Sequence, residues 1–304
     1  MSLLRRFIRN IRRYPDLYLM MLPGVVIIAV FNYIPMYGIQ LAFREFNPLL
    51  GLTGGKFVGL KYINKFVNSY QFWSLIQNTL RLSLSTIVFS FPVPILLALV
   101  FNRLRSARVK KAMQTVVYLP HFISTVVVCG MLQVFFSSKA GLMNNIVRVL
   151  TGYTGSVLGD VKLFPVVYVA SEIWQHAGWN SIIYIAALSS IDPTIYEAAR
   201  IDGASDWQMV WHIDLPSLKS TCINMLILNM GSVLGVGFEK AYLMQNSLNL
   251  PVSEVISTYV YKIGMVNSQY SYSAAIGLFN TVINFFFVYS MNMISRKVSE
   301  ISLW

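Results

Sequence analysis

Six long apolar runs constrain the fold of this chain more than any other feature of its sequence. A helix of roughly 20 apolar residues crosses a bilayer core about 30 Å thick, and each run reaches that length. Charged residues make up only 12% of the 304 residues, against about 25% in ordinary soluble domains. The sequence therefore predicts an all-α integral membrane protein, one domain over 1–304, with six transmembrane helices. The expected spans are 17–40, 75–101, 112–136, 163–189, 217–237 and 271–294.

Basic residues at the ends of the runs predict the orientation of the chain. Short cytoplasmic segments carry an excess of Lys and Arg, and two groups of five flank the early spans. The first run is longer than the apolar core of a signal peptide, about 7 to 15 residues, so we expect it to stay as a span. Both termini and the segment 190–216 are then expected in the cytoplasm. The two groups are Arg5, Arg6, Arg9, Arg12 and Arg13, and Arg103, Arg105, Arg108, Lys110 and Lys111.

The formal net charge of +12 does not indicate a nucleic-acid partner. Most basic residues flank spans, where they hold the topology and attract anionic lipid. Cys129 and Cys222 lie inside expected spans, where a free Cys behaves as a small apolar residue. We therefore expect contact with membrane lipid, no nucleic acid and no disulfide framework.

The chain lacks the motifs that its own catalysis would need. ATP hydrolysis requires a phosphate loop of the form G-x-x-x-x-G-K-[ST]; GLTGGKFVG at 51–59 has the wrong spacing and carries Phe57 in place of the Ser or Thr. His121, His176 and His212 are scattered and match no zinc-site spacing. We expect no catalytic residues, no metal and no cofactor in this chain.

The segment YEAARIDGASDWQMVWHIDLP at 196–216 is polar in a chain that is 56% hydrophobic. It reads as two short helices joined by a turn. Pro193 suits a helix start, and Gly203 can take the positive φ that a turn needs. Its carboxylates are expected to face basic groups on a partner protein. Four of the twelve carboxylates of the chain lie here and a fifth lies just before: Glu197, Asp202, Asp206 and Asp214, with Asp192 nearby.

This segment resembles the EAA loop, E-A-A-x-x-x-G-x(9)-I-x-L-P, of binding-protein-dependent ABC importer permeases. The resemblance implies a coupling helix that docks on a separate cytoplasmic ATPase subunit, which binds the ATP and magnesium. A helix that merely lies on the membrane is the alternative, but such a helix is usually basic. The matching residues, with neighbours expected to share the ATPase contact, are Glu197, Ala198, Ala199, Asp202, Gly203, Ala204, Ile213, Leu215 and Pro216.

Three further stretches, 56–80, 178–205 and 237–264, are similar to the MalF group of sugar permeases and to its LplB-like oligosaccharide and polysaccharide branch. The resemblance implies the type I ABC importer transmembrane fold in a bacterial plasma membrane. It also implies a second homologous permease subunit, two ATPase subunits, an extracellular solute-binding protein or lipoprotein, and an oligosaccharide cargo. Whether the two permeases are identical, which sugar is carried, and whether the outer loop 238–270 contacts the binding protein stay open.

Polar residues inside the expected spans are candidates for the substrate path, because they are costly in lipid. Glu172, His176 and Asn180 recur every four residues and so share a helix face. Helix-to-helix hydrogen bonding is the alternative use of such groups. Arg81 is expected at a similar depth to Glu172, and a contact between them is predicted. Because Arg81 is the one cation expected there, an uncharged or weakly charged sugar is favoured. The candidates are Glu172, Gln175, His176, Trp179, Asn180, Asn229, Ser232, Asn280 and Asn284.

Two other classes of protein remain as alternatives. A membrane-embedded enzyme acting on lipid-linked sugars would need a carboxylate or metal cluster, but the carboxylates of 190–216 are occupied by the EAA pattern. An ion-coupled secondary transporter is normally built from inverted repeats, and no internal symmetry is visible in the sequence.

Overall fold

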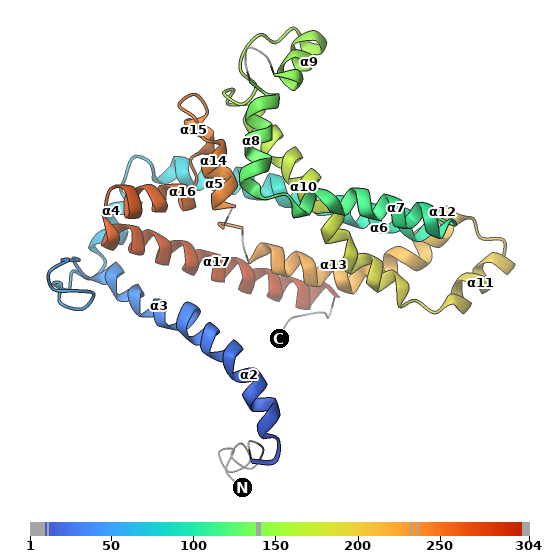
Figure 1. Ribbon diagram of the computed structural model, residues 1–304, viewed down its shortest axis with the longest axis horizontal. Coiled ribbons are helices and arrows are strands. Elements are labelled where there is room, and N and C mark those ends of the chain that lie inside the picture. Colours follow the sequence, from blue (N-terminus) through green and yellow to red (C-terminus); the bar gives the residue numbers. More distant parts are fainter. Residues whose placement is uncertain (1–9, 11, 138–140, 232, 236, 300–304) are drawn as a thin grey trace. The chain divides into compact units, whose positions relative to one another are not determined.

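The computed structural model describes residues 10, 12–137, 141–231, 233–235 and 237–299. Apart from two isolated bridges, these residues form helices and loops (Figure 1). The all-α prediction is confirmed. The contacts divide the chain into two compact units, 1–67 with 263–278 and 68–262 with 279–304. The prediction of one domain stays a prediction.

The first unit is dominated by a continuous apolar helical stretch. α2 (Pro15–Ile28), η1 (Ala29–Tyr33), α3 (Ile34–Met36) and η2 (Tyr37–Phe43) follow one another without a break and enclose the expected span 17–40. Their apolar window is 0% buried in the chain. Such a surface needs lipid or another protein to cover it.

The rest of the first unit is a loop and a short helix. The Arg44 guanidinium holds the loop by donating to the Thr53 and Gly55 carbonyls, at 2.6 and 3.1 Å. The Ser271 hydroxyl accepts from the Phe46 amide at 2.9 Å. α4 (Lys61–Val67), the end of η5 (Lys262–Val266) and the first residues of α17 (Tyr270–Ser299) complete the unit.

The second unit is organised around α10 (Leu163–Ser189), which contacts α5, α6, α7 and α13. α11 lies at one end of this unit, away from α14, α15 and α16 (Figure 1). Its remaining helices are α5 (Phe72–Ser90), α6 (Pro92–Arg103), α7 (Ala107–Tyr118), η3 (Leu119–Phe122), α8 (Thr125–Phe135), α9 (Leu142–Thr151), α11 (Pro193–Ile201), α12 (Asp206–Met209), η4 (Val210–Asp214), α13 (Leu215–Met230), α14 (Phe238–Met244), α15 (Leu250–Ser253), α16 (Ile256–Tyr261) and most of α17.

A sharp bend interrupts the expected span 112–136, which stays a prediction. The chain bends by 94° between the helical stretches Ala107–Phe122 and Thr125–Phe135. Pro120 cannot donate a helical hydrogen bond, Ile123 is extended, and the Ser124 hydroxyl caps α8 by accepting from the Val127 amide. A proline followed by a capping serine therefore ends one helix and begins the next.

The expected span 217–237 is too long. α13 ends at Met230, and the Leu234 amide instead donates to the Asn284 side-chain oxygen at 3.0 Å. Gly231, Gly235 and Gly237 follow the helix closely, and each glycine costs about 1 kcal/mol in a helix interior. The described residues then turn toward α14.

Three helical stretches are long and apolar enough to cross a membrane: Pro15–Phe43, Phe72–Arg103 and Tyr270–Arg296. A fourth is added if the bent pair of α7 and α8 is one span. α10, which has 27 residues, and α13, which has 16, are not among them. The count of six spans therefore stays a prediction for the described residues.

α16 packs within the protein. Ile256 and Thr258 are fully buried. The Ile256 amide donates to the Thr79 hydroxyl of α5 at 3.0 Å, and the Asn78 amide donates to the carbonyl of Pro251 at 2.8 Å. Hydrogen bonds therefore connect the segment that contains α15 and α16 to α5.

Candidate functional site

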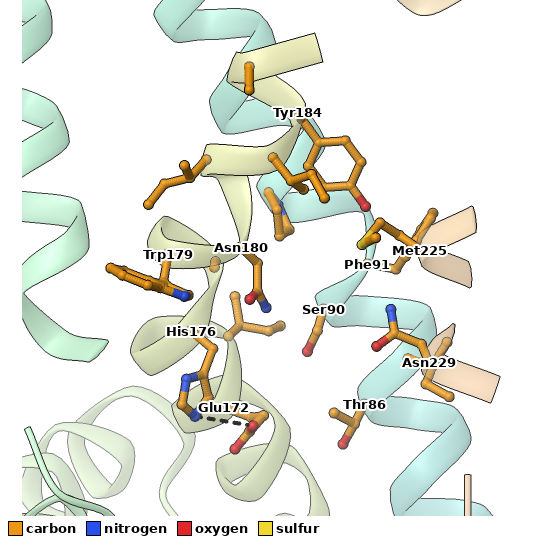
Figure 2. A pocket seen from close by; sticks show the side chains of 17 residues that line it. Thr86, Ser90, Phe91, Glu172, His176, Trp179, Asn180, Tyr184, Met225 and Asn229 are labelled. Carbon is orange, nitrogen blue, oxygen red and sulfur yellow. Dashed lines mark ion pairs between the residues drawn. The ribbon is translucent and has the colours of Figure 1, made fainter. Parts of the chain in front are cut away.

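A pocket of about 670 Å³ lies between α5, α6, α10 and α13 (Figure 2). Small-molecule sites typically have roughly 300–1,000 Å³, with apolar walls and a few polar groups. This pocket fits that description, because residues such as Phe91, Ile173 and Met225 form its walls. The polar residues that line it are Thr86, Ser90, Glu172, His176, Trp179, Asn180, Tyr184 and Asn229.

The predicted shared face of α10 is confirmed. Glu172, His176 and Asn180 all line the pocket. Figure 2 shows Asn180 of α10 to the left of Ser90 and Asn229 of α13 to its right. The four-residue spacing of the α10 residues is therefore enough to bring them to one cavity.

Trp179 also lines the pocket, but one face of its ring is occupied. The His121 ring stacks on the indole with centroids 4.5 Å apart and an angle of 6°. His121 Nδ1 lies 3.1 Å from His176 Nδ1, so one of these two nitrogens donates and the other accepts. At most the second indole face is available to a ligand.

Other predicted path residues do not line the pocket. Gln175 is 2% exposed, and its amide donates to the Ile123 carbonyl at 3.0 Å, where the α7–α8 stretch is broken. Asn284 accepts from the Leu234 amide, and Asn280 has a buried side-chain oxygen away from the lining. Gln175 and Asn284 therefore bond to backbone groups of this chain, whereas the Asn280 side-chain oxygen has no hydrogen-bond partner among the described residues. Ser232 lies outside the described residues.

The predicted Arg81–Glu172 contact is wrong. Glu172 Oε2 accepts from Lys240 Nζ at 2.8 Å, and its Oε1 lies 3.4 Å from His176 Nε2. Lys240 comes from α14, its side chain is 4% exposed, and it lies 5.5 Å from the Tyr168 ring centroid. Arg81 is exposed. The pairing joins residues 68 positions apart, so depth estimates within spans could not find it.

The sequence analysis missed the hydroxyl groups of α5. The Ser83, Thr86 and Ser90 oxygens are buried and form no hydrogen bond with any described residue. Thr79, by contrast, donates to the Leu75 carbonyl of its own helix at 2.7 Å. Thr86 and Ser90 line the pocket. Their helical spacing of three and four residues was the available signal.

The segment 190–216 forms the two helices and the turn that its sequence predicts. α11 begins at Pro193, and the Asp192 carboxylate accepts from the Thr194 amide at 2.9 Å. This hydrogen bonding lowers the pKa of Asp192. Gly203 follows α11 with a φ of +78°, and α12 begins with a capping box of Ser205 and Gln208.

Most of the EAA residues are accessible. Glu197, Ala198, Asp202, Gly203 and Pro216 are exposed. Nothing lies within 4 Å of a Cβ built on Gly203, so close packing inside this chain does not explain the glycine. The positive φ does, and it leaves an open surface. The half-buried members are Ala199, Ala204, Ile213 and Leu215.

Asp214 departs from the expectation that the carboxylates of this segment face a partner. It is fully buried and pairs with the Arg103 guanidinium at the end of α6. The Tyr196 hydroxyl of α11 donates to Asp214 at 2.6 Å. Burial and this hydrogen bond to the carboxylate raise the pKa of Tyr196 to about 12.

A helical membrane unit, a central pocket and an exposed EAA surface together define a transport permease. Residues 90–300 match the family described as "Binding-protein-dependent transport system inner membrane component". The chain belongs to this family. It is therefore a permease subunit of an ABC importer in the bacterial plasma membrane and not an enzyme. Such permeases work with a second permease, ATPase subunits and a solute-binding protein.

The relatives cover nearly the whole chain. Protein LplB of Bacillus subtilis is 40% identical over 294 residues, 97% of this chain and 92% of that protein. The polygalacturonan/rhamnogalacturonan transport system permease YteP, also of B. subtilis, is 40% identical with the same two shares. A bacterial ABC transporter involved in import of the acidic polysaccharide alginate has a chain that is 38% identical, with a TM-score of 0.87 and coverage of 97% and 99%. These matches confirm the type I importer fold and support neither alternative class.

Proposed function

We propose that this chain forms one wall of the path for an acidic oligosaccharide, which contacts the pocket between α5, α6, α10 and α13. The observation that carries the proposal is the set of polar side chains that line one cavity. Thr86 and Ser90 offer buried hydroxyls without a partner among the described residues, and Asn180 offers an amide. Hydroxyls and amides both donate and accept, which matches the hydroxyl groups of a sugar.

The acidic character of the cargo is proposed from the relatives. The alginate importer chain, which is 38% identical to this chain, is described as importing an acidic polysaccharide. YteP, which is 40% identical, is named for polygalacturonan and rhamnogalacturonan transport. This revises the expectation of an uncharged sugar. Glu172 is the one Asp, Glu, Lys or Arg among the described residues that line the pocket, and Lys240 balances its charge. Further positive charge for an acidic sugar would come from the second permease.

The segment 190–216 is the proposed contact with an ATPase subunit. Its support is the complete EAA pattern together with the exposed, open turn at Gly203. This placement requires both termini in the cytoplasm. The basic residues from the end of α6 to the first turns of α7, residues 103–111, favour that orientation.

Ser90→Ala and Asn180→Ala test the pocket. Loss of one neutral hydrogen bond costs roughly 1 kcal/mol, or about five-fold in affinity, so the concentration for half-maximal uptake should rise about that much. Uptake of an acidic and a neutral oligosaccharide into vesicles is compared at equal amounts of assembled complex. Ser189→Ala is the matched control, because this exposed hydroxyl bonds only the Ile185 carbonyl of its own helix. Unchanged uptake by both pocket variants, or uptake of the neutral sugar alone, contradicts the proposal.

Gly203→Glu and Gly203→Ala test the ATPase contact. Both substitutions place a side chain at a positive φ, which costs about 1–3 kcal/mol, and only Glu adds bulk and charge to the open surface. We expect Gly203→Ala to keep substantial uptake and Gly203→Glu to abolish co-purification of the ATPase. Equal uptake and equal ATPase content in the two variants would remove the segment from the interface.

A further inference from the structure

A buried polar cluster joins the last turn of α6 to both ends of the segment 190–216. The Arg103 guanidinium pairs with one Asp214 carboxylate oxygen. The other oxygen accepts from the Tyr196 hydroxyl at 2.6 Å and lies 3.4 Å from the Asn102 amide nitrogen. Arg103 also lies 5.4 Å from the centroid of the Tyr196 ring. Three separate elements, α6, α11 and η4, therefore meet at one carboxylate.

Burial makes this cluster costly to break. Asp214 is 0% exposed and the Arg103 side chain is 19% exposed. Burying an ion pair contributes little net stability, because desolvation offsets the attraction, but removing one partner leaves an uncompensated charge. Such a pair fixes a geometry more than it adds free energy. The pair between Arg103 and the exposed Asp206, at 4.0 Å, is peripheral.

The position of the cluster links the EAA surface to the pocket. Tyr196 directly precedes Glu197, and Asp214 lies between Ile213 and Leu215. α6 packs along α10 and contributes Pro94 to the pocket lining. A displacement of 190–216 as one body must therefore carry α6 with it or break the cluster.

We propose that Arg103, Asp214 and Tyr196 form a coupling latch, which transmits displacement of the segment 190–216 to α6 and hence to the pocket. The latch rests on the proposed function, in which that segment contacts the ATPase. Its residues are positioning residues, since they contact neither sugar nor nucleotide. The property they set is the number of sugars moved for each ATP hydrolysed.

The test uses the complete transporter in proteoliposomes, with uptake and ATP hydrolysis measured together in the presence of loaded binding protein. Tyr196→Phe removes only the hydroxyl that bonds Asp214, and Asp214→Asn removes the charge. We expect uptake per ATP to fall about five-fold in Tyr196→Phe, the effect of one hydrogen bond. In Asp214→Asn, which leaves Arg103 with only the 4.0 Å ion-pair contact to the exposed Asp206, we expect a fall of about ten-fold or more. Complex assembly should persist in Tyr196→Phe.

Ser217→Ala is the matched control, because its hydroxyl bonds only the Ile213 carbonyl of the neighbouring turn, at 2.7 Å. Uptake per ATP should stay unchanged in it. The latch is overturned if Tyr196→Phe and Asp214→Asn keep the normal ratio, or if both prevent assembly, since the cluster is then only a packing group. Gly203→Glu separates the two proposals. Normal uptake by Gly203→Glu refutes the ATPase contact. If Gly203→Glu loses uptake while Tyr196→Phe and Asp214→Asn keep the normal uptake per ATP, only the latch is refuted.

Discussion

At the residue scale, Lys240 pairs with one carboxylate oxygen of Glu172 at 2.8 Å, while His176 lies 3.4 Å from the other. Lys240→Met keeps most of the side-chain volume and removes the charge. An uncompensated charge in a mostly buried place costs about 1–3 kcal/mol, and the 27% exposure of Glu172 favours the lower part of this range. We expect a lower midpoint of thermal unfolding for the solubilised complex.

The double variant Glu172→Gln with Lys240→Met is the control for this prediction. It removes both charges, so it should unfold at a higher temperature than Lys240→Met alone. A double variant that is as unstable as the sum of the two single changes would show that the pair does not interact.

Glu172 and Lys240 also show how much of the site could be predicted from the sequence. The common face of Glu172, His176 and Asn180 follows from helical periodicity, which is local. The ion pair with Lys240 and the stacking of His121 on Trp179 join residues far apart in sequence. No periodicity specifies such pairs, because they depend on how the helices pack.

At the element scale, Gly178 allows α7 and α10 to approach closely. A Cβ at this position would collide with the backbone of Val117. We expect Gly178→Ala to cost roughly 1–3 kcal/mol, the range for overpacking a filled interior, and to reduce the yield of assembled complex. Size-exclusion chromatography of the solubilised transporter measures that yield.

Gly130→Ala in α8 provides the comparison. Nothing lies within 4 Å of a Cβ there, so alanine should be tolerated and can favour the helix, since its propensity exceeds that of glycine. Equal yields for the two variants would contradict a close approach of α7 and α10.

Where helices begin and end could be predicted from the sequence when a single residue sets the boundary. The start of α11 at Pro193 and the turn at Gly203 were predicted, because each depends on the conformational preference of one residue. The bend after Pro120 lies inside the expected span 112–136, and proline signals it locally. Apolar length alone had made 112–136 one span.

At the scale of the whole molecule, the proposed functions require one orientation in the membrane. Single cysteines test it in a chain whose Cys129 and Cys222 are replaced by alanine. Arg108→Cys lies in the first turn of α7 and Thr154→Cys in the loop after α9, and both positions are exposed. In intact cells, a membrane-impermeant thiol reagent should label position 154 and leave position 108 unlabelled until the membrane is opened, because basic links stay in the cytoplasm. The reverse pattern would place the segment 190–216 outside the cell, where it could not meet an ATPase. Both the proposed ATPase contact and the latch built on it would then fail.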